Sequence, residues 1–249
     1  MVSGKLIWLQ SKLISQFNTT TMKFTNHLLL LLAAWGIIVF AACSDDLQTK
    51  IGEQVWATKN LNTATFSNGE PIFEATSFDA WRQAIKEGKP AYCYLDFKPE
   101  NGDKLGKLYN HYAVEDSRGL APKGWHIPNR DEWQYLKILP ANDLRSTSGW
   151  EATDGSVHNG TNKSGFNAMP AGDIHVLDKE RDPYRKDGFD GSTCNVLPDR
   201  STVCGGTASW WCADDCSVLY FHFDDNKLEG PAGDPCSVGH YVRCIKDKQ

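Results

Sequence analysis

The feature that most constrains this chain is an uncharged apolar run over residues 28–42, which ends immediately before Cys43. A transmembrane helix needs about 20 apolar residues, so this run is short for a membrane span. Lys23 precedes the run and Ala41-Ala42 close it, so a positive charge, an apolar stretch and small residues follow in the order of a signal peptide. The sequence therefore predicts an N-terminal targeting signal followed by a domain that folds outside the cytoplasm.

The residues around Cys43 indicate a lipid anchor. The segment Phe40-Ala-Ala-Cys43 resembles a bacterial lipobox, in which the cysteine is acylated and becomes the new N-terminus. An ordinary cleaved secretory signal and a single anchor helix are the alternatives. The acidic pair Asp45-Asp46 resembles the surface-export signal of Bacteroidota lipoproteins, although a solvated tether is also acidic. We expect a protein anchored by lipid in the outer membrane and exposed on the cell surface.

The segment Met22-Lys23-Phe24 is a natural signal-peptide start, and this sets the predicted organisation. We expect a mis-called extension at 1–21, a lipoprotein signal peptide at 22–42, a tether at 43–49 and one domain at 50–247. Residues 1–42 contain three lysines and no acid, so the remaining 207 residues carry a net charge of −8. An acidic chain without a basic stripe argues against nucleic acid as a partner.

Cysteines outside the cytoplasm are expected to pair as disulfides. Seven remain once Cys43 carries lipid: Cys93, Cys194, Cys204, Cys212, Cys216, Cys236 and Cys244. Seven is odd, so at most three bridges form and one thiol is left over. A zinc site at Cys212-x3-Cys216 is an alternative that an oxidising compartment disfavours.

Hydrophobic periodicity predicts an α+β domain with two helices, short antiparallel strands and long disulfide-bearing loops. The helices are expected at 78–87, capped by Thr76 or Ser77, and after Asn129, where Asn129 and Glu132 form a capping box before Trp133 and Leu136. Strands are expected at 51–61, 91–97, 107–114, 217–223 and 237–245. The stretch 142–212 is irregular and rich in Gly, Asp and Ser, which is typical of functional or disulfide-linked loops.

Several blocks of the sequence together resemble one bacterial family, the Fibrobacter succinogenes major paralogous domain. The blocks are Ile51-Gly-Glu-Gln-Val-Trp56 with Asn60-Leu61, Pro90-Ala-Tyr-Cys93, Gly106-Lys-Leu-Tyr-Asn110, Gly119-Leu-Ala-Pro-Lys-Gly-Trp-His-Ile-Pro128, Ser164-Gly-Phe-Asn-Ala168 and Val242-Arg-Cys244. The resemblance covers about residues 50–247. It implies a secreted or lipid-anchored protein, and it carries no established activity.

The step from the Trp-His-Ile-Pro segment into a helix is also similar to C-type-lectin and formylglycine-generating-enzyme folds. That analogy implies that the first and last strands pair, which would bring 51–61 beside 237–245. Because Cys93 and Cys244 both lie in family blocks, we expect them to form a disulfide. The segment Ser209–Cys216 departs from the Trp-Trp-Ser-Ser-like step of the family, so its loop is remodelled here.

Candidate binding residues lie in the irregular region. Exposed tryptophans stack on sugar rings, so Trp150, Trp210 and Trp211 are candidate glycan platforms, with Asp214 and Asp215 beside them. Core packing is the alternative for these rings. It is the expectation for the four other tryptophans of the domain, Trp56, Trp81, Trp125 and Trp133.

Acidic loop residues offer weak candidates for Ca²⁺, which binds six to eight oxygen ligands. These are Asp224, Asp225 and Asn226, with a further acidic group at Asp182, Asp187 and Asp190. Solvated turns explain the same residues better, so we expect no cofactor.

No serine nucleophile elbow, phosphate-binding glycine loop, nucleotide fingerprint or paired-histidine motif occurs in the sequence. The leading hypothesis is a non-enzymatic binding or adhesion module for a glycan or a surface protein, with the membrane as partner through its lipid. A secreted polysaccharide-acting enzyme and a structural subunit of a surface assembly are the alternatives. The ligand, the oligomeric state and the true start codon stay open.

Overall fold

The computed structural model describes residues 47–150, 156–175, 194–196, 202–204, 206–222, 224–233 and 237–248. The chain divides into two compact units, Met1–Ala41 and Ala42–Gln249, and all of the described residues belong to the second. No helix among these residues is long and apolar enough to cross a membrane.

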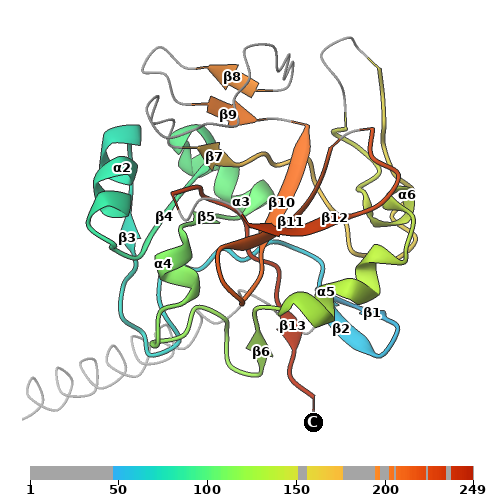
Figure 1. The fold of residues 1–249 in the computed structure, drawn as a ribbon, viewed down its shortest axis with the longest axis horizontal. Coiled ribbons are helices and arrows are strands. Elements are labelled where there is room, and N and C mark those ends of the chain that lie inside the picture. Colours follow the sequence, from blue (N-terminus) through green and yellow to red (C-terminus); the bar gives the residue numbers. More distant parts are fainter. Residues whose placement is uncertain are drawn as a thin grey trace, which may run out of the picture. The chain divides into compact units, whose positions relative to one another are not determined.

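The hairpin at the start of the domain pairs through its second strand with the last strand, as the fold analogy implied. A four-stranded sheet has the order β1 (Gln48–Ile51), β2 (Gln54–Ala57), β13 (Ile245–Lys246) and β6 (Trp125–His126). Trp56 pairs with Ile245, and the amide of Leu61 donates to the carbonyl of Val242 at 2.8 Å. Residues from both ends of the domain thus close one sheet (Figure 1). The strand expected at 51–61 is split, because a turn at Gly52 folds β1 and β2 into a hairpin.

The second sheet lies at the centre of the unit (Figure 1). It consists of β10 (Thr207–Trp211), β11 (Ser217–His222) and β12 (Glu229–Gly233) in antiparallel order. All five residues of β10 are buried, so both of its faces are covered. The prediction of a strand at 217–223 is confirmed over Ser217–His222, and Phe223 lies outside the described residues.

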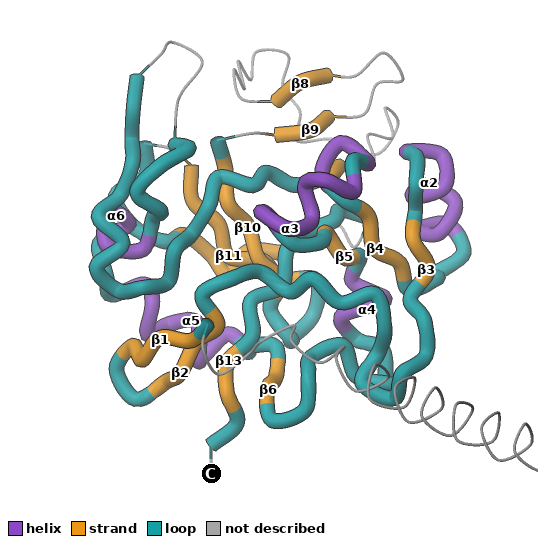
Figure 2. The backbone as a smooth tube through the Cα atoms, turned by 180° about the vertical axis from the view of Figure 1, so that it is seen from behind, coloured by secondary structure: helices purple, strands orange, loops and turns teal. Residues whose placement is uncertain are grey.

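Two smaller sheets complete the described strands. One contains β3 (Phe73–Glu74), β4 (Ala91–Cys93) and β5 (Leu108–Tyr109), and the other contains β7 (Ile174–His175), β9 (Thr202–Cys204) and β8 (Cys194–Val196). β3 and β4 run parallel, so the expectation of antiparallel strands throughout is wrong at this edge. In both Figure 1 and Figure 2, β8 and β9 lie at the opposite end of the unit from β13.

Both predicted helices are present. α2 (Phe78–Lys86) begins at Ser77, whose side chain accepts a hydrogen bond from the Ala80 amide. α5 (Arg130–Lys137) begins with the predicted capping box of Asn129 and Glu132.

The described residues contain three further α-helical turns: α3 (Gly102–Leu105), α4 (His111–Val114) and α6 (Ala141–Leu144). Two 3₁₀ turns, η1 (Leu95–Phe97) and η2 (Pro99–Asn101), precede α3. The strand expected at 107–114 is therefore wrong after Tyr109. Asn110 is the reason, because its Oδ1 accepts the Ala113 amide at 3.0 Å and starts a helical turn. The α+β class holds, with several small sheets.

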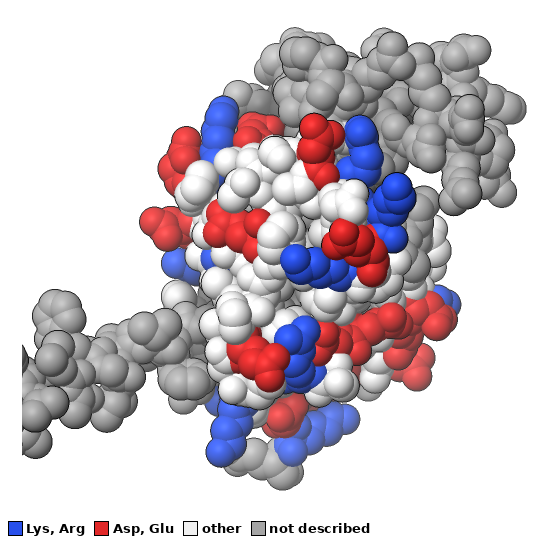
Figure 3. All heavy atoms as spheres, turned by 90° about the vertical axis from the view of Figure 1, so that its left-hand side faces the viewer, with Lys and Arg blue, Asp and Glu red and all other residues white. Residues whose placement is uncertain are grey.

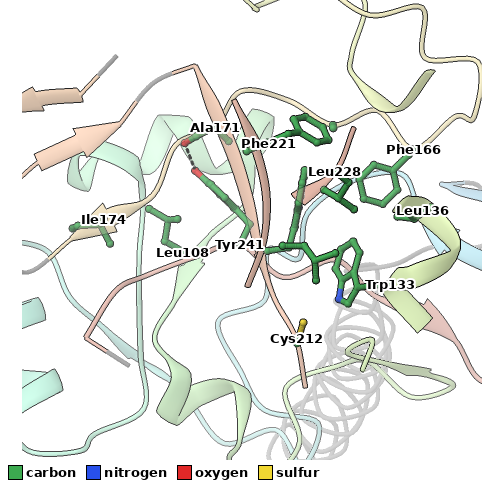
Figure 4. Close-up of a cluster of buried hydrophobic side chains, with 14 of the residues drawn as sticks. Leu108, Trp133, Leu136, Phe166, Ala171, Ile174, Cys212, Phe221, Leu228 and Tyr241 are labelled. Atoms are coloured by element: carbon green, nitrogen blue, oxygen red, sulfur yellow. Dashed lines mark hydrogen bonds between the residues drawn. The ribbon is translucent and has the colours of Figure 1, made fainter. Parts of the chain in front are cut away.

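Aromatic side chains build the core (Figure 4). The Trp133 ring lies 4.9 Å from Trp56 and 6.1 Å from Trp210, measured between ring centroids. Phe166 packs edge-on against Trp210 at 5.4 Å. Such aromatic pairs stabilise a fold by about 0.5–1.5 kcal/mol each beyond the burial of the rings. The Tyr241 hydroxyl is satisfied there by donating to the Ala171 carbonyl at 3.1 Å.

A buried arginine joins three of the sequence blocks that carry the family resemblance. The Arg243 side chain is 1% exposed. Its Nε and Nη2 donate to Oδ1 of Asn60 at 3.1 and 2.7 Å, and its Nη1 donates to the carbonyls of Ala57 and Phe166 at 3.1 and 2.5 Å. Trp210 Nε1 donates to the same Asn60 oxygen at 2.9 Å. The blocks near Asn60, Phe166 and Arg243 thus meet at one polar centre inside the core.

Candidate functional site

The three tryptophans expected to present exposed faces are buried. Trp150 and Trp211 are 0% exposed and Trp210 is 1% exposed, so the expectation of glycan platforms at these rings is wrong. Neighbouring side chains of a strand point to opposite faces, and this places Trp210 and Trp211 in two different apolar clusters. Because β10 is covered on both faces, neither ring reaches solvent.

Asp214 and Asp215 are exposed and lie against the N-terminus of α5. Asp214 Oδ2 accepts the Arg130 amide at 2.9 Å, and Asp215 Oδ2 lies 3.5 Å from Arg130 Nη2. The Asp215 carbonyl lies 2.7 Å from His111 Nε2, and its own φ is +48°. Negative charge at a helix N-terminus is favourable, so the contacts of Asp214 and Asp215 stabilise the packing of the β10–β11 connection against α5.

The weak calcium candidates form the turn between β11 and β12. Asp225 Oδ2 accepts the His222 amide at 2.6 Å, and the Asn226 carbonyl accepts the Ala141 amide at 2.8 Å. The guanidinium of Arg145 donates to the carbonyls of His222 and Asp225, which puts a positive charge beside Asp224 and Asp225. In the part of the chain that the structure describes, no three ligand-type side chains gather in a metal-binding group. Asp182, Asp187 and Asp190 lie outside that part.

The expected Cys93–Cys244 disulfide does not form, because Cys93, Cys212 and Cys244 are buried thiols. Cys93 and Cys244 belong to two different apolar clusters. Burial, with a smaller contribution from nearby Asp214, raises the pKa of the Cys212 thiol to about 12. Cys212 does not bridge to Cys216, because Cys212 is a thiol whereas Cys216 is disulfide-bonded to another residue.

The remaining cysteines have no described side chains. Cys194 and Cys204 lie directly opposite each other on β8 and β9, and Cys43 and Cys236 lie outside the described residues. With three buried thiols, the seven cysteines of the domain supply at most two bridges, rather than the three allowed by the count.

A serine, a histidine and an aspartate come together without forming a catalytic triad. His240 Nδ1 lies 2.7 Å from Ser209 Oγ and 3.9 Å from Asp173 Oδ2. A catalytic histidine uses one nitrogen for the serine and the other for the carboxylate, whereas both groups here face Nδ1. Ser209 and His240 are also almost fully buried, so this set is part of the core.

A pocket lies where α5 meets the β1–β2 hairpin, two elements that are neighbours in Figures 1 and 2. Its volume is about 280 Å³. The lining residues come from the hairpin, from α5 with its cap, and from the end of the chain: Glu53, Gln54, Asn129, Asp131, Glu132, Tyr135 and Lys248.

One residue of the pocket lining, Gln54, is fixed by hydrogen bonds. Gln54 is buried, its Nε2 donates to the Glu132 carbonyl at 3.1 Å, and its Oε1 accepts from Trp56 Nε1 at 3.1 Å. Tyr135, which also lines the pocket, is 52% exposed. The pocket lining therefore includes an ordered amide and an aromatic ring that solvent can reach.

His126, beside this pocket, lies between two carboxylates. Its Nε2 is 2.9 Å from Glu132 Oε1 and its Nδ1 is 2.7 Å from Asp247 Oδ1. Burial lowers the pKa of His126, but the hydrogen bonds to Glu132 and Asp247 outweigh burial and raise it above its ordinary value. Glu132 therefore serves two partners, since its Oε2 also accepts the Asn129 amide at 3.0 Å.

Sequence reasoning found the capping box but not the pocket that it borders. The sequence places His126 six residues before Glu132, and this spacing could have suggested a contact between them. No local pattern indicates that Asp247, 121 residues later, lies against the other ring nitrogen of His126.

The comparisons with known proteins give a family and no closer relative. The family model described as Fibrobacter succinogenes major domain matches residues 49–246. No curated protein matches, and no solved structure matches. Because the family model covers most of the chain, the protein belongs to the Fibrobacter succinogenes major domain family.

Proposed function

We propose that this protein is a lipid-anchored, surface-displayed binding module that holds a glycan at the pocket between α5 and the β1–β2 hairpin. The observation that carries the proposal is the composition of that pocket, which places carboxylates and amides beside the exposed ring of Tyr135. Carboxylate and amide groups bind sugar hydroxyls, and an aromatic face packs on sugar C–H surfaces. No cofactor is part of the proposal.

The charge distribution supports a glycan rather than a nucleic acid. On the face shown in Figure 3, lysine and arginine side chains are interspersed with acidic ones and form no continuous basic stripe. The pocket itself is lined by Glu53, Asp131 and Glu132 with one lysine, Lys248. Phosphate groups would be repelled there, whereas neutral hydroxyl groups would not.

The anchor and the lectin-like fold belong to the same proposal. Cys43 lies five positions before Gln48, where β1 begins, so a lipid there would hold the hairpin end of the domain near the outer membrane. The pairing of β2 with β13 supports the C-type-lectin-like arrangement, because that arrangement needs the two ends of the domain in one sheet.

Two alternative functions would require different features at the same pocket. A polysaccharide-cleaving enzyme needs two carboxylates at the scissile bond, and three carboxylates line the pocket. A structural subunit needs an exposed apolar surface, and Tyr135 and Ile138 on α5 are 52% and 80% exposed.

A glycan array probed with the purified full-length chain in detergent, with and without Ca²⁺, separates these readings. We expect binding to one class of glycan, unchanged when Ca²⁺ is removed. Turnover of a polysaccharide that Glu53→Gln abolishes would establish the enzyme instead. An array without signal, together with stable co-purification of a protein, would establish the structural subunit.

A further inference from the structure

The hydrogen bonds of His126 require both of its ring nitrogens to carry a proton. An ionised carboxylate only accepts hydrogen bonds, and both ring nitrogens lie within 2.9 Å of a carboxylate oxygen. A neutral imidazole has one N–H, so it satisfies either Glu132 or Asp247 and presents a lone pair to the other. Only the imidazolium form holds both carboxylates.

From this geometry we infer that His126 is a pH-operated latch, which fastens the end of the chain to α5 and sets how open the adjoining pocket is. The effect of the latch on ligand binding rests on the proposed function of the pocket. The effect of the latch on the segment after β13 is independent of that function.

The two carboxylates differ in how firmly the rest of the fold holds them. Glu132 belongs to α5, its Oε2 accepts the Asn129 amide, and its carbonyl accepts from Gln54. Asp247 follows the last strand, its carboxylate is 54% exposed, and its amide donates to the Gly124 carbonyl at 3.0 Å. When the imidazole loses a proton, it can keep only one of its two hydrogen bonds to carboxylates. The bond to Asp247 breaks, because the fold holds Asp247 less firmly than Glu132.

Lys248 moves with Asp247, and this is how the latch reaches the pocket. Lys248 lines the pocket and directly follows the latched residue. Release of the chain end removes this wall and opens the pocket on the side of the C-terminus.

The charges around His126 favour its protonated form. Glu132 faces it from α5 and Asp247 faces it from the segment after β13. Glu53, Asp131 and Lys248 line the adjoining pocket. On β13, the ammonium of Lys246 is engaged elsewhere, 3.3 Å from Gln48 Oε1 and 5.7 Å from the Trp125 ring centroid.

The direction of the pH response follows from these charges. The pKa of His126 is raised in the folded protein, so the latch is closed at acidic pH. It opens as the pH rises through that raised pKa.

The test uses the full-length chain in detergent, with histidines labelled for NMR, titrated from about pH 5 to pH 9, a range that brackets the usual histidine pKa. Loss of one signal in His126→Gln assigns it, and His158→Gln, which removes a histidine bonded to Ser156, is the matched control. We expect His126 to titrate above 6.5 and amide exchange of residues 246–248, corrected for its intrinsic pH dependence, to rise with the same midpoint.

Asp247→Asn makes the test specific to the charge of Asp247. The Asn amide can accept a hydrogen bond from the protonated ring and donate one to the neutral ring, so it can stay bound to both forms. This variant should lower the midpoint of His126 by about one pH unit and abolish the pH step in exchange. A His126 midpoint at or below 6.5, or a step that Asp247→Asn leaves in place, would overturn the latch. Neither readout contains a glycan, so failure of the array leaves the latch standing, and failure of the latch leaves the array result standing.

Discussion

The carboxamide oxygen of Asn60 accepts hydrogen bonds from Arg243, which lies 183 positions later in the chain, at 2.7 and 3.1 Å. Trp210 Nε1 donates to the same oxygen at 2.9 Å. One acceptor therefore serves three donors in a region where water does not reach. Residues from the blocks that carry the family resemblance therefore build a buried polar centre.

Replacing Asn60 with leucine tests that centre. Asn60→Leu leaves Arg243 Nε and Nη2 and the Trp210 N–H without this acceptor, and a buried donor that loses its acceptor costs about 1–3 kcal/mol. Summed over the three hydrogen bonds, we expect the free energy of unfolding to fall by about 3–5 kcal/mol, measured by urea denaturation of the full-length chain. Asn60→Asp, which keeps the acceptor, should lose much less, and equal losses in both variants would contradict this account.

The buried tryptophans should behave as core residues. Trp210→Ala removes a ring that packs on Trp133, Phe166 and Phe221, and we expect it to cost about 3–5 kcal/mol of unfolding free energy. Tyr135→Ala, on the exposed side of α5, should change stability by less than about 1 kcal/mol. Thermal unfolding of the two variants checks the contrast, and a silent Trp210→Ala would show that the ring is not in the core.

Gly106 allows the close approach of two family blocks. Its φ is +84°, and an added Cβ would lie 2.8 Å from both the Asn60 Cβ and the Leu61 carbonyl oxygen. Gly106→Ala should therefore lower the free energy of unfolding by about 2–4 kcal/mol. Gly69→Ala is the matched control, because Gly69 has φ +89° with no atom within 4 Å, and backbone strain alone costs about 1–2 kcal/mol. Equal effects would remove the steric argument.

The thiol of Cys212 should be unreactive in the folded protein. Its pKa of about 12 means that a fraction on the order of 10⁻⁴ is thiolate at pH 8, and the thiolate is the reactive form. We expect iodoacetamide to modify Cys212 at least 100-fold more slowly in the native chain than in the denatured chain, with a rise as the pH approaches 12. Peptide mapping measures both rates, and rapid native labelling would contradict the buried position.

The other cysteines should form two disulfides. Cys194 and Cys204 face each other across an antiparallel pair, where Cα atoms are about 4.5–5.5 Å apart, a distance that a disulfide spans. Their bridge leaves Cys236 for Cys216, since Cys43 carries the proposed lipid. A non-reducing digest should show these two linked peptide pairs. Any linkage of Cys93 to Cys244 would contradict the structure.

Local signals predicted the helices well, because their information lies within a few residues. Ser77 caps α2 as expected, and the capping box of Asn129 and Glu132 starts α5. The strand expected at 107–114 fails for an equally local reason, since Asn110 can cap a turn as readily as it can occupy a strand.

The candidate site could not be predicted in the same way. Exposure of Trp210 and Trp211 depends on what covers the two faces of β10, and those covering residues come from distant parts of the chain. The pocket likewise needs Glu53, Tyr135 and Lys248, which are brought together only when β13 pairs with β2. The burial of these tryptophans and the position of the pocket therefore depend on contacts between distant parts of the chain, which local periodicity does not predict.

The measurement that tests the central claim most directly compares glycan binding by the wild-type chain, Tyr135→Ala and Ile138→Ala on the same array. Both substitutions shorten an exposed side chain of the α5 region, but only Tyr135 lines the pocket. We expect Ile138→Ala to bind as the wild type does and Tyr135→Ala to lose at least tenfold in affinity, about 1.4 kcal/mol. Unchanged binding by Tyr135→Ala, or an equal loss in both variants, would contradict a glycan site in this pocket.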